Sequence, residues 1–174
     1  MRTRSGSPRA DRPVMPGYGL LPGHEGAGLL PWSWAEERIA KARSLWVSTV
    51  RDDGRPHAMP VWGVWIAGGF WFSTGLVTVK ARNLARSPLC VLTTESADEA
   101  VIIEGRAQLE GDADELAEVS AAYVAKYAMP WPPDSAVYCV VPHLAFGIIE
   151  EASQFAGSAT RWHFPAAGPV SSGS

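Results

Sequence analysis

The chain has 174 residues, of which 47% are hydrophobic, and a formal net charge of -3. This length and apolar content suit one domain with a substantial core, and the acidic balance argues against a nucleic-acid-binding protein, which needs a basic surface. The longest apolar runs are too short to span a membrane and the polar, Arg-rich N-terminus does not resemble a secretory signal, so we expect a cytoplasmic protein that binds neither nucleic acid nor membrane.

Residues 1–31 are expected to form an N-terminal extension, partly flexible, because they are rich in Arg, Ser, Gly and Pro and have few periodic apolar residues. Within it we expect a mobile tail over residues 1–11 and an ordered arm that packs over the domain or its partner. A helix is predicted over residues 32–44, with Ser33 and Glu36 as a capping box. The folded domain is expected to cover residues 32–164, and residues 165–174 to be a flexible tail.

A series of antiparallel strands is predicted next. The first covers residues 45–51 and turns at Asp52-Asp53-Gly54-Arg55, because Asp-Gly supplies the positive φ that a tight hairpin needs. Residues 57–65 form the return strand, and a second turn at residues 67–69 leads into a strand over residues 70–74.

The second half of the chain mixes helices with further strands. A helix begins at Thr78, a plausible N-cap, and ends before Pro88. Strands are predicted over residues 89–94, 99–109, 136–141 and 144–150, the second of them long enough to bend at Gly105. A helix runs from its cap at Asp112 to about Tyr127. About six or seven antiparallel strands with flanking helices predict an α+β, mainly β fold, a closed or nearly closed Greek-key barrel, because such sheets must hide their edges.

The strongest candidate for a binding site is the helix that begins at Thr78. Its first turns carry Lys80 and Arg82, with Asn83 as an amide donor. Cations are slightly unfavourable at a helix N-terminus unless an anion lies there, so the pattern hints at a phosphate. The local pattern alone favours the alternative, two solvated basic residues on a surface helix.

Familiar catalytic and metal-binding signatures are missing from the sequence. The four histidines, His24, His57, His143 and His163, are scattered, and no nucleophile or dinucleotide-binding motif occurs. Cys90 and Cys139 lie in apolar runs and are expected to be free buried thiols. A candidate anion site without acid–base residues indicates a cofactor that brings its own reactivity.

Four segments, in this order, resemble the split β-barrel flavin/deazaflavin oxidoreductase superfamily, which includes pyridoxamine 5′-phosphate oxidase-like proteins: residues 46–62, 72–75, 80–88 and 101–107. The resemblance extends over residues 32–164, and the Lys-x-Arg-Asn-Leu form at residue 80 is most similar to the branch that binds coenzyme F420. The resemblance implies a split β-barrel, a homodimer with two cofactor sites at the subunit interface, and a small-molecule substrate. With it, the interpretation of Lys80 and Arg82 as anion ligands becomes the favoured one.

The resemblance also implies roles for individual residues. Lys80, Arg82 and Asn83 would hold the phosphate-bearing tail of the cofactor. The ring would be lined, largely through backbone groups, by two strand segments, which contribute His57, Met59, Pro60, Val61, Ser73, Thr74 and Gly75. The segment with Arg161 and Trp162 would close the site, either from the same chain or from the other subunit.

The implied function is an F420-dependent oxidoreductase that transfers hydride to a quinone, an enone or a tetrapyrrole. The alternatives are an FMN-binding flavoprotein and a non-catalytic cofactor carrier. Several tryptophans are candidate stacking walls, although core packing or a dimer contact is the favoured interpretation of any single one; they are Trp62, Trp65, Trp71 and Trp162.

Overall fold

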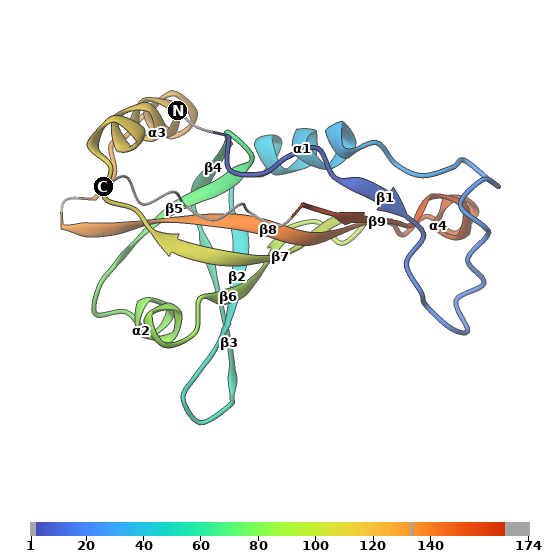
Figure 1. The fold of residues 1–174 in the computed structure, drawn as a ribbon, viewed down its shortest axis with the longest axis horizontal. Helices are drawn as coiled ribbons and strands as arrows, with labels where there is room; N and C mark the ends of the chain where they lie inside the picture. The colour runs from blue at the N-terminus through green and yellow to red at the C-terminus, as the bar shows by residue number, and fades with distance from the viewer. Residues whose placement is uncertain (1–2, 133, 166–174) are drawn as a thin grey trace.

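The computed structural model describes residues 3–132 and 134–165. These residues form one antiparallel sheet of nine strands with four helices around it, which confirms the α+β, mainly β prediction (Figure 1). None of the helices in this described part combines the length and the apolar character needed to cross a membrane. The elements are β1 (Arg9–Asp11), α1 (Trp32–Lys41), β2 (Leu45–Val50), β3 (Pro56–Val61), β4 (Gly63–Ile66), β5 (Gly69–Gly75), α2 (Val79–Arg86), β6 (Leu89–Thr94), β7 (Glu99–Leu109), α3 (Ala113–Tyr127), β8 (Ser135–Ile149), α4 (Ala152–Ser158) and β9 (Thr160–His163).

The longest strand of the sheet, β8, pairs with three others, β5, β7 and β9. The strand order is β1-β9-β8-β7-β6-β2-β3, and β5 pairs with both β4 and β8. The register of β7 against β8 shifts between Glu104 and Gly105, where a side chain on Gly105 would lie 2.6 Å from Val140. The bend predicted at Gly105 is therefore confirmed. Pro142 has no N–H to donate, and it lies at this irregularity, where the ladder tolerates the missing donor. β8 therefore continues past Pro142 as one strand, where the sequence predicted two.

The return strand predicted over residues 57–65 is two strands that part at Trp62. β3 pairs with β2, and β4 pairs with β5. Gly63 makes the change of neighbour possible, because a Cβ there would lie 2.3 Å from the carbonyl oxygen of Trp71. The Tyr127 hydroxyl accepts a hydrogen bond from the Gly63 N–H at 3.0 Å and donates one to the Gly63 carbonyl at 2.9 Å. The end of α3 is thus hydrogen-bonded to the backbone where β3 gives way to β4.

Alternation along β5 divides its aromatic residues between two cores. Phe70 and Phe72 lie in the larger core cluster, and Trp71 lies in a second cluster beneath α3. Cys90 and Cys139 are free and buried, as predicted. Burial raises the pKa of both thiols to about 12.

The N-terminal residues differ most from expectation. The mobile tail expected over residues 1–11 is wrong for the part that pairs with the sheet, because β1 lies antiparallel to β9. The capping box expected at Ser33 is also wrong: α1 begins after Pro31 without a side-chain cap, and it ends at Lys41. The flexible tail expected over residues 165–174 lies, apart from Pro165, outside the described residues.

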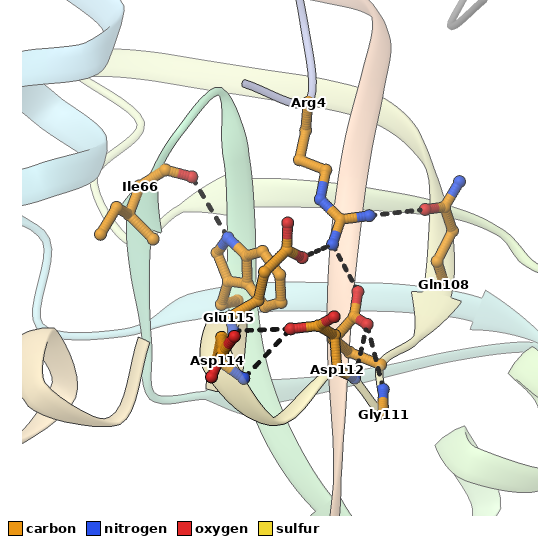
Figure 2. A network of polar contacts seen from close by, with 9 residues as sticks. Arg4, Ile66, Gln108, Gly111, Asp112, Asp114 and Glu115 are labelled. Atoms are coloured by element: carbon orange, nitrogen blue, oxygen red, sulfur yellow. Dashed lines mark hydrogen bonds and ion pairs between the residues drawn. The ribbon is translucent and has the colours of Figure 1, made fainter. Parts of the chain in front are cut away.

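The segment before β1 is held by the side chain of Arg4. Its guanidinium donates hydrogen bonds to Glu110, Glu115 and Gln108 (Figure 2). The Arg4 N–H donates to the carbonyl of Ala67. These contacts tie the N-terminal segment to β7, to α3 and to the β4–β5 turn.

Candidate functional site

The two strand segments predicted to line the cofactor ring each have an unpaired backbone edge. β3 is at the end of the sheet and, in the described chain, pairs only with β2. The β4–β5 ladder ends at Gly63 and Phe72, so residues 73–75 of β5 pair only with β8 within the described residues. Backbone groups along these two edges are therefore available to a ligand.

The start of α2 lies beside the end of β5. The Thr78 hydroxyl accepts a hydrogen bond from the N–H of Ala81, which confirms Thr78 as the N-cap. Lys80 turns back from the helix and donates to the hydroxyl of Thr74 at 3.1 Å, which itself lies 3.1 Å from that of Thr78. The fold thus brings Thr74 and Lys80 together, as the predicted site requires.

A cavity of about 320 Å³ lies on the other side of α2. Its lining includes three arginines, Arg51, Arg82 and Arg86, together with Asn83 and a single carboxylate, Asp52. Arg86 donates to the carbonyl of Val50 at 2.7 Å, which ties the end of α2 to β2.

We call Arg51, Lys80, Arg82 and Arg86 the α2 cation cluster. None of the four forms an ion pair with any carboxylate in the described residues, although the chain has more acidic than basic side chains. Burial lowers the pKa of Lys80. Three arginines line the cavity with only one carboxylate, Asp52, and such an excess of positive charge around one helix favours an anionic ligand.

His57 lies next to this cluster. Burial lowers its pKa, and the positive charges of Arg51 and Lys80 lower it further. Its Nδ1 is buried and has no hydrogen-bond partner among the described residues. The neutral imidazole therefore offers one uncommitted nitrogen close to two cations.

Asn83 lines the cavity beside α2 and also has a contact within the protein. Its side chain is buried and its Nδ2 donates to the hydroxyl of Thr49 at 2.9 Å. Thr49 in turn donates to the carbonyl of His57. The amide hydrogen-bonds within the protein and holds β2 and β3 against α2, which positions the cluster.

Met59, Pro60 and Val61 lie on β3 with alternating orientation. Met59 and Val61, two residues apart, pair with buried residues of β2 and lie on the inner face of the sheet, where Met59 is exposed and Val61 is buried. Pro60 pairs with Trp46 and faces the outer side of the sheet. Their side chains therefore do not form one wall, and what they share is the free backbone edge of β3.

Arg161 and Trp162 are not brought to the cluster within one chain. They lie on β9, which is separated from β3 by four strands in the sheet order. Trp162 is 1% exposed, lies in the core and donates to the carbonyl of Leu30. Arg161 donates to Asp11 at 2.8 Å.

The other candidate stacking tryptophans also have partners of their own. Trp71 is fully buried and donates to the carbonyl of Ile66. Trp62 stacks on Tyr127 with ring centres 5.0 Å apart. Trp65 packs against Trp32.

The sequence interpretation missed Arg51 and Arg86. Arg86 follows Arg82 by one helical turn, so the two lie on one face of α2. This spacing could have been recognised in the sequence. Arg51 follows Thr49 with strand alternation and so faces α2, but only the packing of α2 on β2 reveals which face that is.

The family model described as pyridoxamine 5′-phosphate oxidase matches residues 34–148, which include both free edges and α2. No curated protein matches the chain.

Three solved structures with the same fold carry different functional descriptions. A conserved hypothetical protein from Mycobacterium tuberculosis has a TM-score of 0.60 and 21% identity over 67% of this chain and 82% of its own. A heme binding protein from Mycobacterium smegmatis has a TM-score of 0.59 and 20% identity over 71% of this chain and 56% of its own. An F420 reductase has a TM-score of 0.52 and 20% identity over 63% of this chain and 94% of its own. At these identities the likeness establishes the fold alone, and it confirms the split-barrel prediction.

Proposed function

Because the chain belongs to the pyridoxamine 5′-phosphate oxidase family, as the resemblance predicted, we propose that it is an oxidoreductase that uses coenzyme F420, with FMN as the alternative cofactor. The proposed reaction is hydride transfer to an electron-poor small molecule of the quinone, enone or tetrapyrrole class. The observation that carries the proposal is the α2 cation cluster, which has no ion-pair partner in the described residues. The form Lys-Ala-Arg-Asn-Leu and the F420 reductase among the similar structures favour F420 over FMN.

The residues of the cluster fit the anionic tail of either cofactor. A deazaflavin tail ends in carboxylates and FMN ends in a phosphate, and both accept charged hydrogen bonds from Lys and Arg. Arg82 and Arg86 line the cavity with several donors each, and Lys80 supplies a point charge beside Thr74. We therefore assign the tail to the cluster and leave Asn83 a positioning role.

The reduced deazaflavin supplies the hydride when it is bound. The chain's own contribution is orientation and the exclusion of water. The free backbone edges of β3 and of residues 73–75 would hydrogen-bond the polar rim of a planar ring, and their lack of strand partners supports this assignment. His57 lies on β3 between Arg51 and Lys80, next to the start of the tail site.

We further propose that the protein is a homodimer with a site at each end of the interface. In such a dimer Arg161 of β9 would reach the site of the partner, since within one chain it lies far along the sheet from α2. Trp162 would stay in the core of its own subunit, where it is buried.

The test is a side-by-side titration of apo protein with F420 and FMN. We expect Lys80→Ala to weaken binding of the preferred cofactor by about tenfold or more, and Arg82→Ala to weaken it less, because each removes a charged donor from the tail. Arg55→Ala is the matched control, since Arg55 is exposed and pairs with Asp53 on the hairpin. Unchanged titration curves for both cluster variants would contradict the proposal.

A cofactor carrier is the second candidate, favoured by the similar fold of a heme binding protein. The two candidates differ in turnover. An oxidoreductase consumes reduced cofactor when a quinone, an enone or a biliverdin-like tetrapyrrole is added, and a carrier does not. Absorbance of the reduced cofactor over time separates them.

A further inference from the structure

A second cavity, of about 410 Å³, lies between the N-terminal segment, α1 and the β4–β5 turn. Trp32 and Glu36 of α1 and Trp65 of β4 line it, and Thr3 with residues 5–8 closes one side. It shares no lining residue with the cavity beside α2. Its volume is in the range of small-ligand sites.

The N-terminal side of this cavity is fixed by hydrogen bonds to the turn. The Arg4 N–H donates to the carbonyl of Ala67, and the Ser5 hydroxyl donates to that of Gly68 at 2.8 Å. The Arg4 side chain points away, to Glu110 and Glu115 (Figure 2). Its positive charge is therefore neutralised at α3 and not supplied to the cavity.

Among the described residues, Glu36 is the one charged side chain in the lining. Its Oε1 accepts a hydrogen bond from the indole N–H of Trp65 at 3.2 Å. No described cation forms an ion pair with Glu36, whereas Glu37, next to it on α1, pairs with Lys41 at 2.6 Å. The cavity thus combines a carboxylate without a cationic partner in the described chain and two indole rings.

We propose that this cavity binds a small organic cation of the alkylammonium class, held by the Glu36 carboxylate against Trp32 and Trp65. Indole rings attract such cations through the negative face of the ring, and the alkyl groups of the cation can contact the two rings. A single carboxylate with hydroxyl neighbours is a poor set of ligands for a hard divalent metal, which takes several oxygens. The inference is independent of the cofactor site.

The test is a titration of the full-length protein with tetramethylammonium chloride, followed by the indole N–H resonance of Trp65 in ¹H–¹⁵N spectra. Trp65→Phe assigns that resonance by removing it. We expect saturable movement of the Trp65 signal, and no such movement with sodium chloride at equal concentration or with 3,3-dimethylbutan-1-ol, a neutral molecule of related shape.

Glu36→Gln keeps an oxygen that can accept from Trp65 but removes the charge, so we expect it to weaken binding roughly tenfold. Glu37→Gln is the matched control, because it removes an exposed charge from the same helix, and we expect its affinity to stay within about twofold of the unaltered protein. Thermal melting of both variants checks that they fold. The proposal is overturned if the Trp65 signal does not saturate, if the neutral molecule binds equally well, or if both variants bind alike.

Discussion

The charges around His57 decide how the site responds to pH. Arg51 approaches it from the end of β2 and Lys80 from α2, and both oppose protonation of the imidazole, as does burial. The ordinary pKa of a histidine is about 6.5, so the folded protein takes up this proton below that pH. An anion bound to the cluster would offset the two positive charges and make protonation easier.

We predict that stability falls as pH drops below about 6.5, because the unfolded chain binds the His57 proton more readily than the folded one. The effect develops through that window and levels off once His57 is protonated in both states. Melting temperatures between pH 7.5 and 5 should show a smaller decline for His57→Gln. His24→Gln serves as control, since the His24 side chain is 82% exposed. Identical pH profiles for His57→Gln and the unaltered protein would contradict this account.

A second residue-scale prediction concerns Asn83. Asn83→Ala should lower the free energy of unfolding by about 1–3 kcal/mol, because it removes a buried donor and leaves the Thr49 hydroxyl without that partner. Arg82→Ala, exposed on the same helix, should change stability by less than about 0.5 kcal/mol. Urea unfolding measures both, and equal losses would argue against the positioning role.

At the scale of elements, the opening of the barrel depends on where one strand changes its neighbour. β3 and β4 would form one uninterrupted return strand if the chain did not turn at Trp62. Gly63 allows the close approach to Trp71, and Tyr127 satisfies the polar groups of Gly63. The free edges of β3 and β5 follow from this change.

Gly63→Ala should therefore lower the free energy of unfolding by about 2 kcal/mol or more, because its Cβ would meet backbone and the Phe70 ring. Gly111→Ala is the matched control, since nothing lies within 4 Å of a Cβ there. Denaturant unfolding compares the two. If the two variants lost the same stability, close packing at Gly63 would not be what positions the strands.

These elements also show what a sequence can predict. The Asp-Gly hairpin, the Thr78 and Asp112 caps and the bend at Gly105 were predictable, because each depends on local backbone conformation or on a few neighbouring residues. The division at Trp62, the unbroken β8 and the pairing of β1 with β9 were not, because they depend on which distant strand lies alongside. Lys80 and Arg82 could be proposed from sequence because they lie in the first turns of one helix, whereas the proposal of Arg51 needed the packing of α2 on β2.

For the whole molecule, the outer face of β2, β3 and β6 is the surface that the proposed dimer would cover. Trp46 and Val50 of β2 are 43% and 50% exposed, and Leu89 of β6 is 53% exposed. Strand pairing places Pro60 beside Trp46 on this face. Contiguous apolar surface of this kind is typical of an interface between subunits.

Leu89→Lys should therefore shift the protein from dimer towards monomer, because a charge would be buried in the interface. Val124→Lys is the matched control, since Val124 is also exposed but lies on α3. Sedimentation velocity at micromolar concentration measures both. If the unsubstituted protein were already monomeric, the proposed dimer and its shared site would be contradicted.

The free edge of β3 has one more consequence. An unpaired strand can accept a strand from another molecule and start self-templated growth of fibrils. Pro56 and Pro60 lie near either end of β3, and neither can donate an amide hydrogen bond to an incoming strand. The chain can thus leave this edge open for the proposed cofactor while the two prolines discourage polymerisation through it.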